Sequence, residues 1–356
     1  MKKIYRPGVY SQYDVVSRQK SYTGRYAFFC GGAKVKEGKN LPAGGVVQLR
    51  SIEQLEEYFE AQGSGEMFCT VCRILLQSGV EGLYVVPVTI DGTEPASELY
   101  SAAIQKLCEV KQTGVMLCAS SEQSVLEVLR DQVQQASQNE RERLAVGAVE
   151  KANAEQVAQA LNSERFVLCA QQATSSLAGE TASVLLSAAA VAGMLAVCQP
   201  MQSMHSQELG VLDSVETLEE DEVETLLGAG VTVLEENESQ AVECIRCVTT
   251  RTTTGGEEDR TFAPVNVVLM IDDIIQSVRQ RLTAMVKGSQ TAYSEDSIAS
   301  QVAVILDEKK QEGLIRDFQP PVVYREEDDP SVCVVELEFG LMAVFSQIYL
   351  TAHISV

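Results

Sequence analysis

Short apolar segments alternate with helical segments along the first half of the chain, and this alternation limits the possible folds more than any other feature. The expected helix and strand pairs are 66–77 with 83–88, 96–110 with 114–119, 122–138 with 144–149, and 154–162 with 166–170. Buried apolar strands separated by helices are typical of parallel sheets that carry helices on both faces. We therefore expect an α/β fold with a doubly wound, mostly parallel sheet, which an earlier buried strand at 25–32 would join.

The second half of the chain has a different pattern, which predicts an α+β C-terminal domain. Two long helices are expected at about 265–286 and 295–312, and Pro320 with Pro321 ends helix formation after them. The expected parts are an N-terminal extended arm (1–22), an α/β body (23–250) with a subdivision near 175–200 as the alternative, the helical part of a C-terminal domain (251–330), and a C-terminal β ribbon (331–356).

The C-terminal ribbon shows the period of two that a half-buried strand produces. Its last residues place Ile348, Leu350 and Ile354 on one side, and the preceding run alternates Glu336 and Glu338 with apolar residues. A chain end frays unless another strand pairs with it. The ribbon is therefore predicted to pair with a strand of a neighbouring copy, and the alternative is a hairpin folded onto its own domain.

The N-terminal arm combines a helix-breaking start with a strong positive charge. Pro7 and Gly8 interrupt any helix, so the arm is expected to be extended. Residues 1–50 carry ten Lys and Arg but two Asp and Glu, a balance of +8, whereas the remaining residues carry 18 and 48, a balance of −30. We predict that this arm adds as a strand to the acidic ribbon of another copy; the alternative is that its charges are simply solvated. The residues expected to make the contact are Lys2, Lys3, Arg6, Pro7, Gly8, Val9 and Tyr10 on the arm and Glu336, Glu338, Ile348, Leu350 and Ile354 on the ribbon.

The overall charge and hydropathy exclude several classes of partner. The formal net charge is −22 at pH 7, so we expect this chain not to bind nucleic acid or anionic lipid. The longest apolar segment, the Ala-rich stretch 182–197, is too short to span a membrane, and the N-terminus lacks the apolar core of a signal peptide. We therefore expect a soluble globular chain that does not insert into membranes and is made and kept in the cytosol.

No pattern in the sequence predicts a catalytic, cofactor or metal site. The phosphate loops GxGxxG and GxxxxGK[ST] do not follow any of the expected strands. Cys69-x-x-Cys72 and Cys244-x-x-Cys247 could be read as zinc or redox pairs, but both lie in apolar segments, where cysteine acts as a small hydrophobic residue. The sequence contains two histidines, His205 and His353. No Gly-x-Ser-x-Gly elbow accompanies them. Taken together, these absences lead us to expect no enzyme activity, no cofactor and no metal. For a chain kept in the cytosol we also expect no disulfide.

Several short motifs follow one another in order along the chain. They are Pro7-Gly8-Val9-Tyr10, Gly31-Gly32-Ala33, Ala192-Gly193-Met194, Gly230-Val231, Arg251-Thr252-Thr253-Thr254, and Asn266-Val267 with Asp272 and Ile275. In this order, and with the terminal ribbon, they resemble the contractile tail sheath proteins of phages and of R-type bacteriocins. The resemblance covers nearly the whole chain.

The resemblance implies a structural protein rather than an enzyme. Sheath proteins of this kind form stacked hexameric rings around an inner tube, and their contraction drives the tube through the envelope of a target cell. The implied partners are further copies of the chain, the inner tube protein, and baseplate and terminator or collar proteins. The particle would be assembled in the cytoplasm of a bacterial host and released as a phage tail or a bacteriocin.

The sequence also offers residues for contact with such a tube. A basic helix end is scarce on so acidic a chain, which makes Arg279, Arg281 and Lys287 the residues expected to face the tube. The alternative interpretation of the whole chain is a cytosolic α/β enzyme or small-molecule-binding protein that uses the carboxyl edge of its sheet.

Overall fold

The computed structural model describes residues 24–343, except for 62, 90–94, 180, 288–293 and 330. The residues of the predicted contact that lie outside this part of the chain are Lys2, Lys3, Arg6, Pro7, Gly8, Val9, Tyr10, Ile348, Leu350 and Ile354. Predictions that rest on those residues alone stay predictions.

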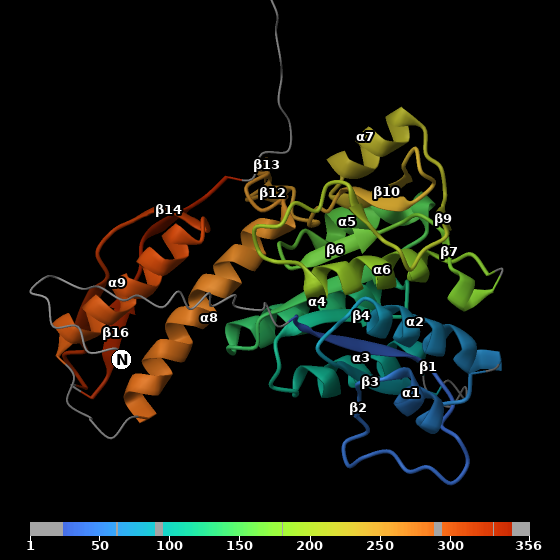
Figure 1. The fold of residues 1–356 in the computed structure, drawn as a ribbon, viewed down its shortest axis with the longest axis horizontal. Coiled ribbons are helices and arrows are strands. Elements are labelled where there is room, and N and C mark those ends of the chain that lie inside the picture. The colour runs from blue at the N-terminus through green and yellow to red at the C-terminus, as the bar shows by residue number, and fades with distance from the viewer. Residues whose placement is uncertain are drawn as a thin grey trace, which may run out of the picture.

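Among the described residues, nine strands form one large sheet at the centre of the molecule, in the order β2-β3-β1-β4-β5-β6-β10-β11-β8 (Figure 1). The central strands from β3 to β10 run parallel to their neighbours, and β2, β11 and β8 pair antiparallel at the two edges. The strands are β1 Tyr26–Gly32, β2 Val47–Leu49, β3 Leu83–Val88, β4 Gly114–Cys118, β5 Arg143–Ala148, β6 Phe166–Cys169, β8 Gln207–Glu208, β10 Val231–Glu236 and β11 Val242–Arg246. This arrangement confirms the expected α/β class and the mostly parallel sheet, to which the structure adds antiparallel edges.

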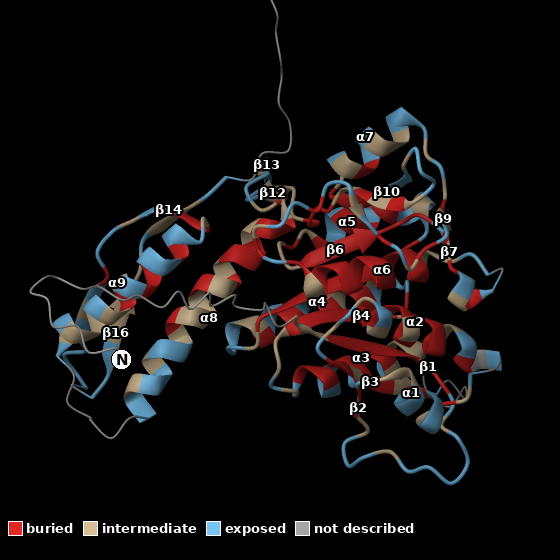
Figure 2. Ribbon diagram, viewed as in Figure 1, coloured by how far each residue is buried: buried red, intermediate tan, exposed pale blue. Residues whose placement is uncertain are grey.

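Helices cover both faces of this sheet because its parallel strands are apolar on both sides. Helices α1, α2 and α6 share a core with one face, and α3, α4, α5 and α7 share a core with the other. The helices are α1 Ile52–Tyr58, α2 Glu66–Gln77, α3 Ala96–Cys108, α4 Gln123–Gln138, α5 Ala154–Leu161, α6 Val184–Val197 and α7 Glu220–Gly228. Strands β4, β5 and β6 are buried at every residue between these two layers, as Figure 2 shows.

Helix α6 is enclosed by protein on all sides, and its small side chains make this possible. Twelve of its fourteen residues are buried, and it packs against α2, β4 and β5. The Ser183 hydroxyl accepts a hydrogen bond from the backbone N–H of Leu185 and so caps the first turn. The closest approach is at Gly193, where an added Cβ would lie 2.2 Å from Oγ of Ser78 at the end of α2. Only glycine therefore fits at this crossing.

The remaining helices and strands form a smaller unit beside the sheet. Helix α8 leaves the body at its first turns and runs outward to α9 and four short strands (Figure 1). These elements are α8 Val265–Lys287, α9 Glu295–Gln311, β14 Ile315–Phe318, β15 Val322–Arg325, β16 Cys333–Glu336 and β17 Phe339–Leu341. We call residues 270–343 the C-terminal unit and the described residues before them the body. The unit has a core of its own, to which α8 contributes Met270, Ile274 and Val278.

The described part of the predicted ribbon pairs with strands of its own chain. Strand β16 pairs antiparallel with β15, and β17 pairs antiparallel with β14. Strands β14 and β15 both lie within 251–330, which the sequence pattern predicts as the helical part of the C-terminal domain, so that prediction is wrong for these residues. The alternative prediction, a hairpin folded onto its own domain, therefore describes Cys333–Leu341. The last predicted strand of the ribbon lies outside the described residues.

Two small hairpins complete the secondary structure of the described chain. They are β7 Ala173–Thr174 with β9 Ser214–Val215, and β12 Thr253–Thr254 with β13 Glu257–Glu258. None of the described helices combines the length and the apolar character that crossing a bilayer requires.

The close contact at Gly193 yields a stability prediction. Gly193→Ala should lower the free energy of unfolding by about 1–3 kcal/mol, because the new Cβ forces α6 and α2 apart in a packed core. Chemical denaturation followed by circular dichroism measures the change. The matched control is Gly228→Ala at the end of α7, where an added Cβ meets no atom within 4 Å. Equal stability of the two variants would contradict the tight crossing of α6 and α2.

Candidate assembly surface

Helix α8 changes its surroundings along its length, and this change produces the most distinctive surface of the molecule. Val265, Val268 and Leu269 belong to the core of the body. Met270, Ile274 and Val278 instead pack against α9 and the hairpins. The last turns of α8 therefore extend past the body with apolar side chains that the body does not cover.

An apolar groove of about 370 Å³ lies between the outer half of α8 and the ribbon. Its apolar lining residues are Ile275, Val278, Leu282, Val286, Val335 and Leu337. Val286, in this lining, is 81% exposed. The groove therefore offers apolar area that a further segment of protein would bury.

The ribbon beside the groove has an exposed acidic side and a strand edge. Glu336 and Glu338 are both exposed, and Glu336 accepts a hydrogen bond of 2.9 Å from the Tyr324 hydroxyl. This hydrogen bond raises the pKa of Tyr324 above its ordinary value. Strand β16 pairs with β15 on one side, and within the described chain no strand pairs with its other edge. The residues predicted for arm contact on the described ribbon are thus on the surface.

The three basic residues expected to face a tube differ in their surroundings. Nη1 of Arg279 lies 2.7 Å from a carboxylate oxygen of Glu142, at the turn between α4 and β5. Arg281 and Lys287 are exposed, and neither has an ion-pair partner among the described residues. Arg279 therefore ties α8 to the body, whereas Arg281 and Lys287 project from the outer end of the helix.

A second ion pair joins α8 to the body at Asp272, which lies nearer to the start of the helix than Arg279 does. Both terminal nitrogens of the Arg165 guanidinium, Nη1 and Nη2, donate to the Asp272 carboxylate, at 2.9 and 2.7 Å. The two side chains are only 16% and 10% exposed. Burial raises the pKa of the Asp272 carboxyl above its ordinary value, and the hydrogen bonds from Arg165 offset that shift only in part. Burial would lower the pKa of Arg165, but its bonds to Asp272 raise it overall.

The amino end of α8 and its contact with α9 are also fixed by polar groups. The Asn266 amide donates to the backbone carbonyls of Pro200 and Gln202, at 2.8 and 2.9 Å. In α9, the buried Lys309 ammonium donates to Asp273 at 2.6 Å and to Glu312 at 2.9 Å. The first contact anchors α8 to the body, and the second anchors α9 to α8.

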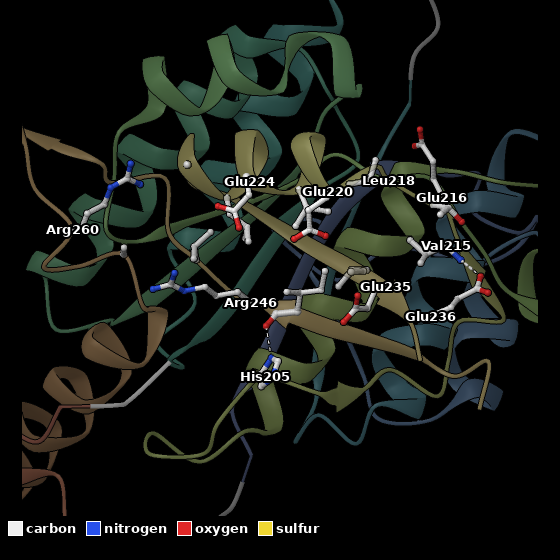
Figure 3. A pocket seen from close by; sticks show the side chains of 18 residues that line it. His205, Val215, Glu216, Leu218, Glu220, Glu224, Glu235, Glu236, Arg246 and Arg260 are labelled. Atoms are coloured by element: carbon white, nitrogen blue, oxygen red, sulfur yellow. Dashed lines mark hydrogen bonds between the residues drawn. The ribbon is translucent and has the colours of Figure 1, made fainter. Parts of the chain in front are cut away.

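A different cavity, of about 640 Å³, lies at the far edge of the sheet between α7 and strands β10 and β11 (Figure 3). Glutamates surround it, and His205 lies at one end, where its Nδ1 is 2.8 Å from the carbonyl of Ile245. The ring thus contacts a backbone carbonyl rather than a nucleophile or a carboxylate, which are the partners that acid–base catalysis uses.

The cysteines of the two Cys-x-x-Cys pairs lie in the core. All four are buried and free, and burial raises the pKa of the Cys72 thiol well above its ordinary value. Within the part of the chain that the structure describes, no cluster of histidine, cysteine and acidic residues could hold a metal ion. These cysteines pack as small hydrophobic residues, as the apolar segments around them predicted.

Comparison with known proteins points to one kind of assembly. No protein-family profile matches the chain, and no curated protein does either. Among solved structures, a sheath tail protein from Listeria innocua matches with a TM-score of 0.72 and 14% identity over 91% of this chain and 93% of that one. The contracted helical sheath of the anti-feeding prophage matches with a TM-score of 0.72 and 12% identity over 98% of both chains. The contracted PVC sheath of an extracellular contractile injection system matches with a TM-score of 0.66 and 13% identity over 99% of this chain and 98% of that one.

The chain has the fold of contractile sheath proteins. At these low sequence identities, the structural similarity establishes the fold. It thereby confirms, for the fold, the family resemblance that the sequence motifs indicate. Because the match to the PVC sheath covers 99% of this chain, the sheath fold comprises both the body and the C-terminal unit.

The buried pair in this sheath fold yields a second stability prediction. Asp272→Ala should lower the free energy of unfolding by about 3–5 kcal/mol, because it leaves the Arg165 guanidinium buried without its partner. Thermal or chemical denaturation measures the loss. Asp317→Ala is the control: its pair with Arg316 is 62% and 67% exposed, and its removal should cost about 0–1 kcal/mol. Similar losses in the two variants would show that the Asp272 pair does not stabilise the junction.

Proposed function

We propose that this chain is the subunit of a contractile sheath, a structural component of a contractile injection particle such as a phage tail or a bacteriocin. The observation that carries this proposal is the likeness to a contracted helical sheath, which extends over 98% of both chains. A sheath acts through its contacts with other subunits and needs no catalytic site. The exposed apolar groove and strand edge of the C-terminal unit suit that role.

The proposed assembly is a stack of hexameric rings around an inner tube, whose contraction drives the tube through the envelope of a target cell. A match to a protein of the six-fold symmetrised baseplate of the anti-feeding prophage supports the six-fold arrangement, with a TM-score of 0.71 and 11% identity over 99% of this chain. The proposed partners are further copies, the inner tube protein, and baseplate and terminator or collar proteins. Arg281 and Lys287 are the proposed contacts to the tube, since Arg279 is already held by Glu142.

We further propose that copies are joined by strand addition at the C-terminal unit. A neighbour's N-terminal arm would add its main chain to the ribbon and place an apolar side chain such as Val9 in the apolar groove. Its Lys2 and Lys3 would then approach the exposed Glu336 and Glu338. Three features support this contact: the exposed apolar groove, the edge of β16 and the opposite charges of arm and ribbon. Head-to-tail exchange of this kind generates rings or helical stacks.

Electron microscopy of the purified chain tests the proposed function. The expected particles are rings, tubes or polymerised sleeves. Small compact oligomers at every protein concentration and salt concentration would contradict the sheath proposal and would favour an α/β enzyme or binding protein.

A groove variant tests strand addition separately. Val286→Glu should lower the association constant between copies about tenfold or more, because it removes the burial of a valine and adds a charge at the contact. It should not affect folding, since Val286 is exposed in the single chain. Sedimentation or light scattering over a concentration series measures the association.

The matched control for this variant is Val304→Glu on α9. Val304 is 49% exposed and does not line the apolar groove. Its substitution should leave assembly unchanged, and deletion of residues 1–20 should reproduce the defect of Val286→Glu. Equal assembly of the two glutamate variants would show that the apolar groove is not the contact.

A further inference from the structure

The joint between the body and the C-terminal unit is mostly polar beyond the first turns of α8. Apolar packing between α8 and the body is extensive only up to Leu269, because the later apolar residues of the helix belong to the core of the C-terminal unit, against which the body packs the partly buried Met201. Beyond that point, two ion pairs tie α8 to the body, Asp272–Arg165 and Arg279–Glu142. A polar joint is held by the direction and distance of its bonds rather than by buried apolar area.

The two ion pairs fasten one face of α8 to one edge of the sheet. Asp272 and Arg279 are seven residues apart, which places them on the same side of the helix and about 10 Å apart along its axis. Their partners precede neighbouring parallel strands: Glu142 directly before β5 and Arg165 directly before β6. The helix thus crosses the amino-terminal edge of the sheet and is held there at two heights.

The surroundings of the two ion pairs leave α8 room to move when the pairs are removed. A cleft of about 900 Å³ lies beside Asp272, lined among others by polar residues such as Gln112, Gln276 and Gln280. The second carboxylate oxygen of Glu142 is buried without a hydrogen-bond partner among the described residues. The cleft leaves room for α8 to shift, and Met201, which is only partly buried, is the body residue whose apolar packing opposes that shift.

We propose that these two ion pairs form a latch that fixes the angle between the C-terminal unit and the body. With the latch intact, α8 projects in one direction. Without it, α8 pivots at its first turns, where Val265, Val268 and the hydrogen bonds of Asn266 still hold it to the body. Breaking the pairs exposes little apolar area, so both parts stay folded while their relative orientation varies.

This inference concerns the shape of a single chain and does not depend on the proposed function. In a sheath, the same angle would set where the apolar groove of one copy meets the arm of the next. A chain that does not assemble would therefore contradict the proposed function but not the latch, and an unchanged angle in the variants would contradict the latch but not the proposed function.

Pulsed electron paramagnetic resonance can measure the angle as a distance within one chain. Cys333 on the ribbon is exposed and the other nine cysteines are buried, so a nitroxide label attaches to the C-terminal unit without further substitution. A second label is placed on the body by Gln134→Cys, on the exposed side of α4. Dilution of the labelled chain with unlabelled chain removes the signals between copies.

Two variants remove the pairs while keeping side chains of similar shape. One is Glu142→Gln with Arg279→Gln, and the other is Arg165→Gln with Asp272→Asn. Removing both charges of a pair together avoids an unpaired buried charge, so both variants are expected to fold. The control is Lys151→Gln with Glu222→Gln, which neutralises a partly exposed pair on the body away from α8.

The unsubstituted chain and the control should each give one narrow distance distribution. Each latch variant should give a broader distribution or a second distance, with an unchanged far-UV circular dichroism spectrum. A distribution as narrow as that of the unsubstituted chain in a folded latch variant would overturn the proposal. The partly exposed Arg279 pair provides this test even if the more buried Arg165 pair proves necessary for folding.

Discussion

The need to cover a parallel sheet on both faces determines the rest of this structure. Its central strands are apolar on both sides, so helices must occupy each face before the body is stable. Helices α2 and α6 fill one face and α3, α4 and α5 fill the other. No face of the sheet is left for α8, which is nevertheless apolar along most of its length. Helix α8 therefore packs against α9 and the hairpins, and its apolar side chains that these elements leave uncovered line the apolar groove.

The regular part of the body could be predicted from the sequence because its signals are local. The segment expected as a helix at 122–138 is Gln123–Gln138, and the strand expected at 166–170 is Phe166–Cys169. Strand β11, by contrast, ends at Arg246. After Arg246 the chain no longer pairs as a strand of the sheet. The backbone N–H of Thr250 instead donates to the carbonyl of Phe166, on a strand far away in sequence. Such long-range bonds leave no periodic pattern in the sequence.

The candidate surface was only partly predictable, for the same reason. The alternation of the ribbon predicted strands correctly, but it could not say which strand would pair with them. The partner β15 is a run of four residues, Val322–Arg325, between two prolines and an acidic turn, too short to show a period of its own. The prediction that Arg279 faces a tube rests on the scarcity of basic helix ends on so acidic a chain. The partner of Arg279, Glu142, lies 137 positions earlier, and only the fold brings the two together.

Charge poses the last constraint on any assembly of this chain. Copies with a net charge of −22 repel one another, so association must gain more from local contacts than it loses to that repulsion. At physiological ionic strength the screening length is roughly 8 Å, which confines electrostatic effects to surfaces that nearly touch. What matters is then the sign of the charge at the contact rather than the total. A basic arm that meets an acidic ribbon reverses the repulsion where the chains approach, and burial of apolar side chains in the groove adds a term that salt does not screen. In the proposed contact, the separation of charge along the sequence and the exposed groove on α8 would therefore act together by independent physical means.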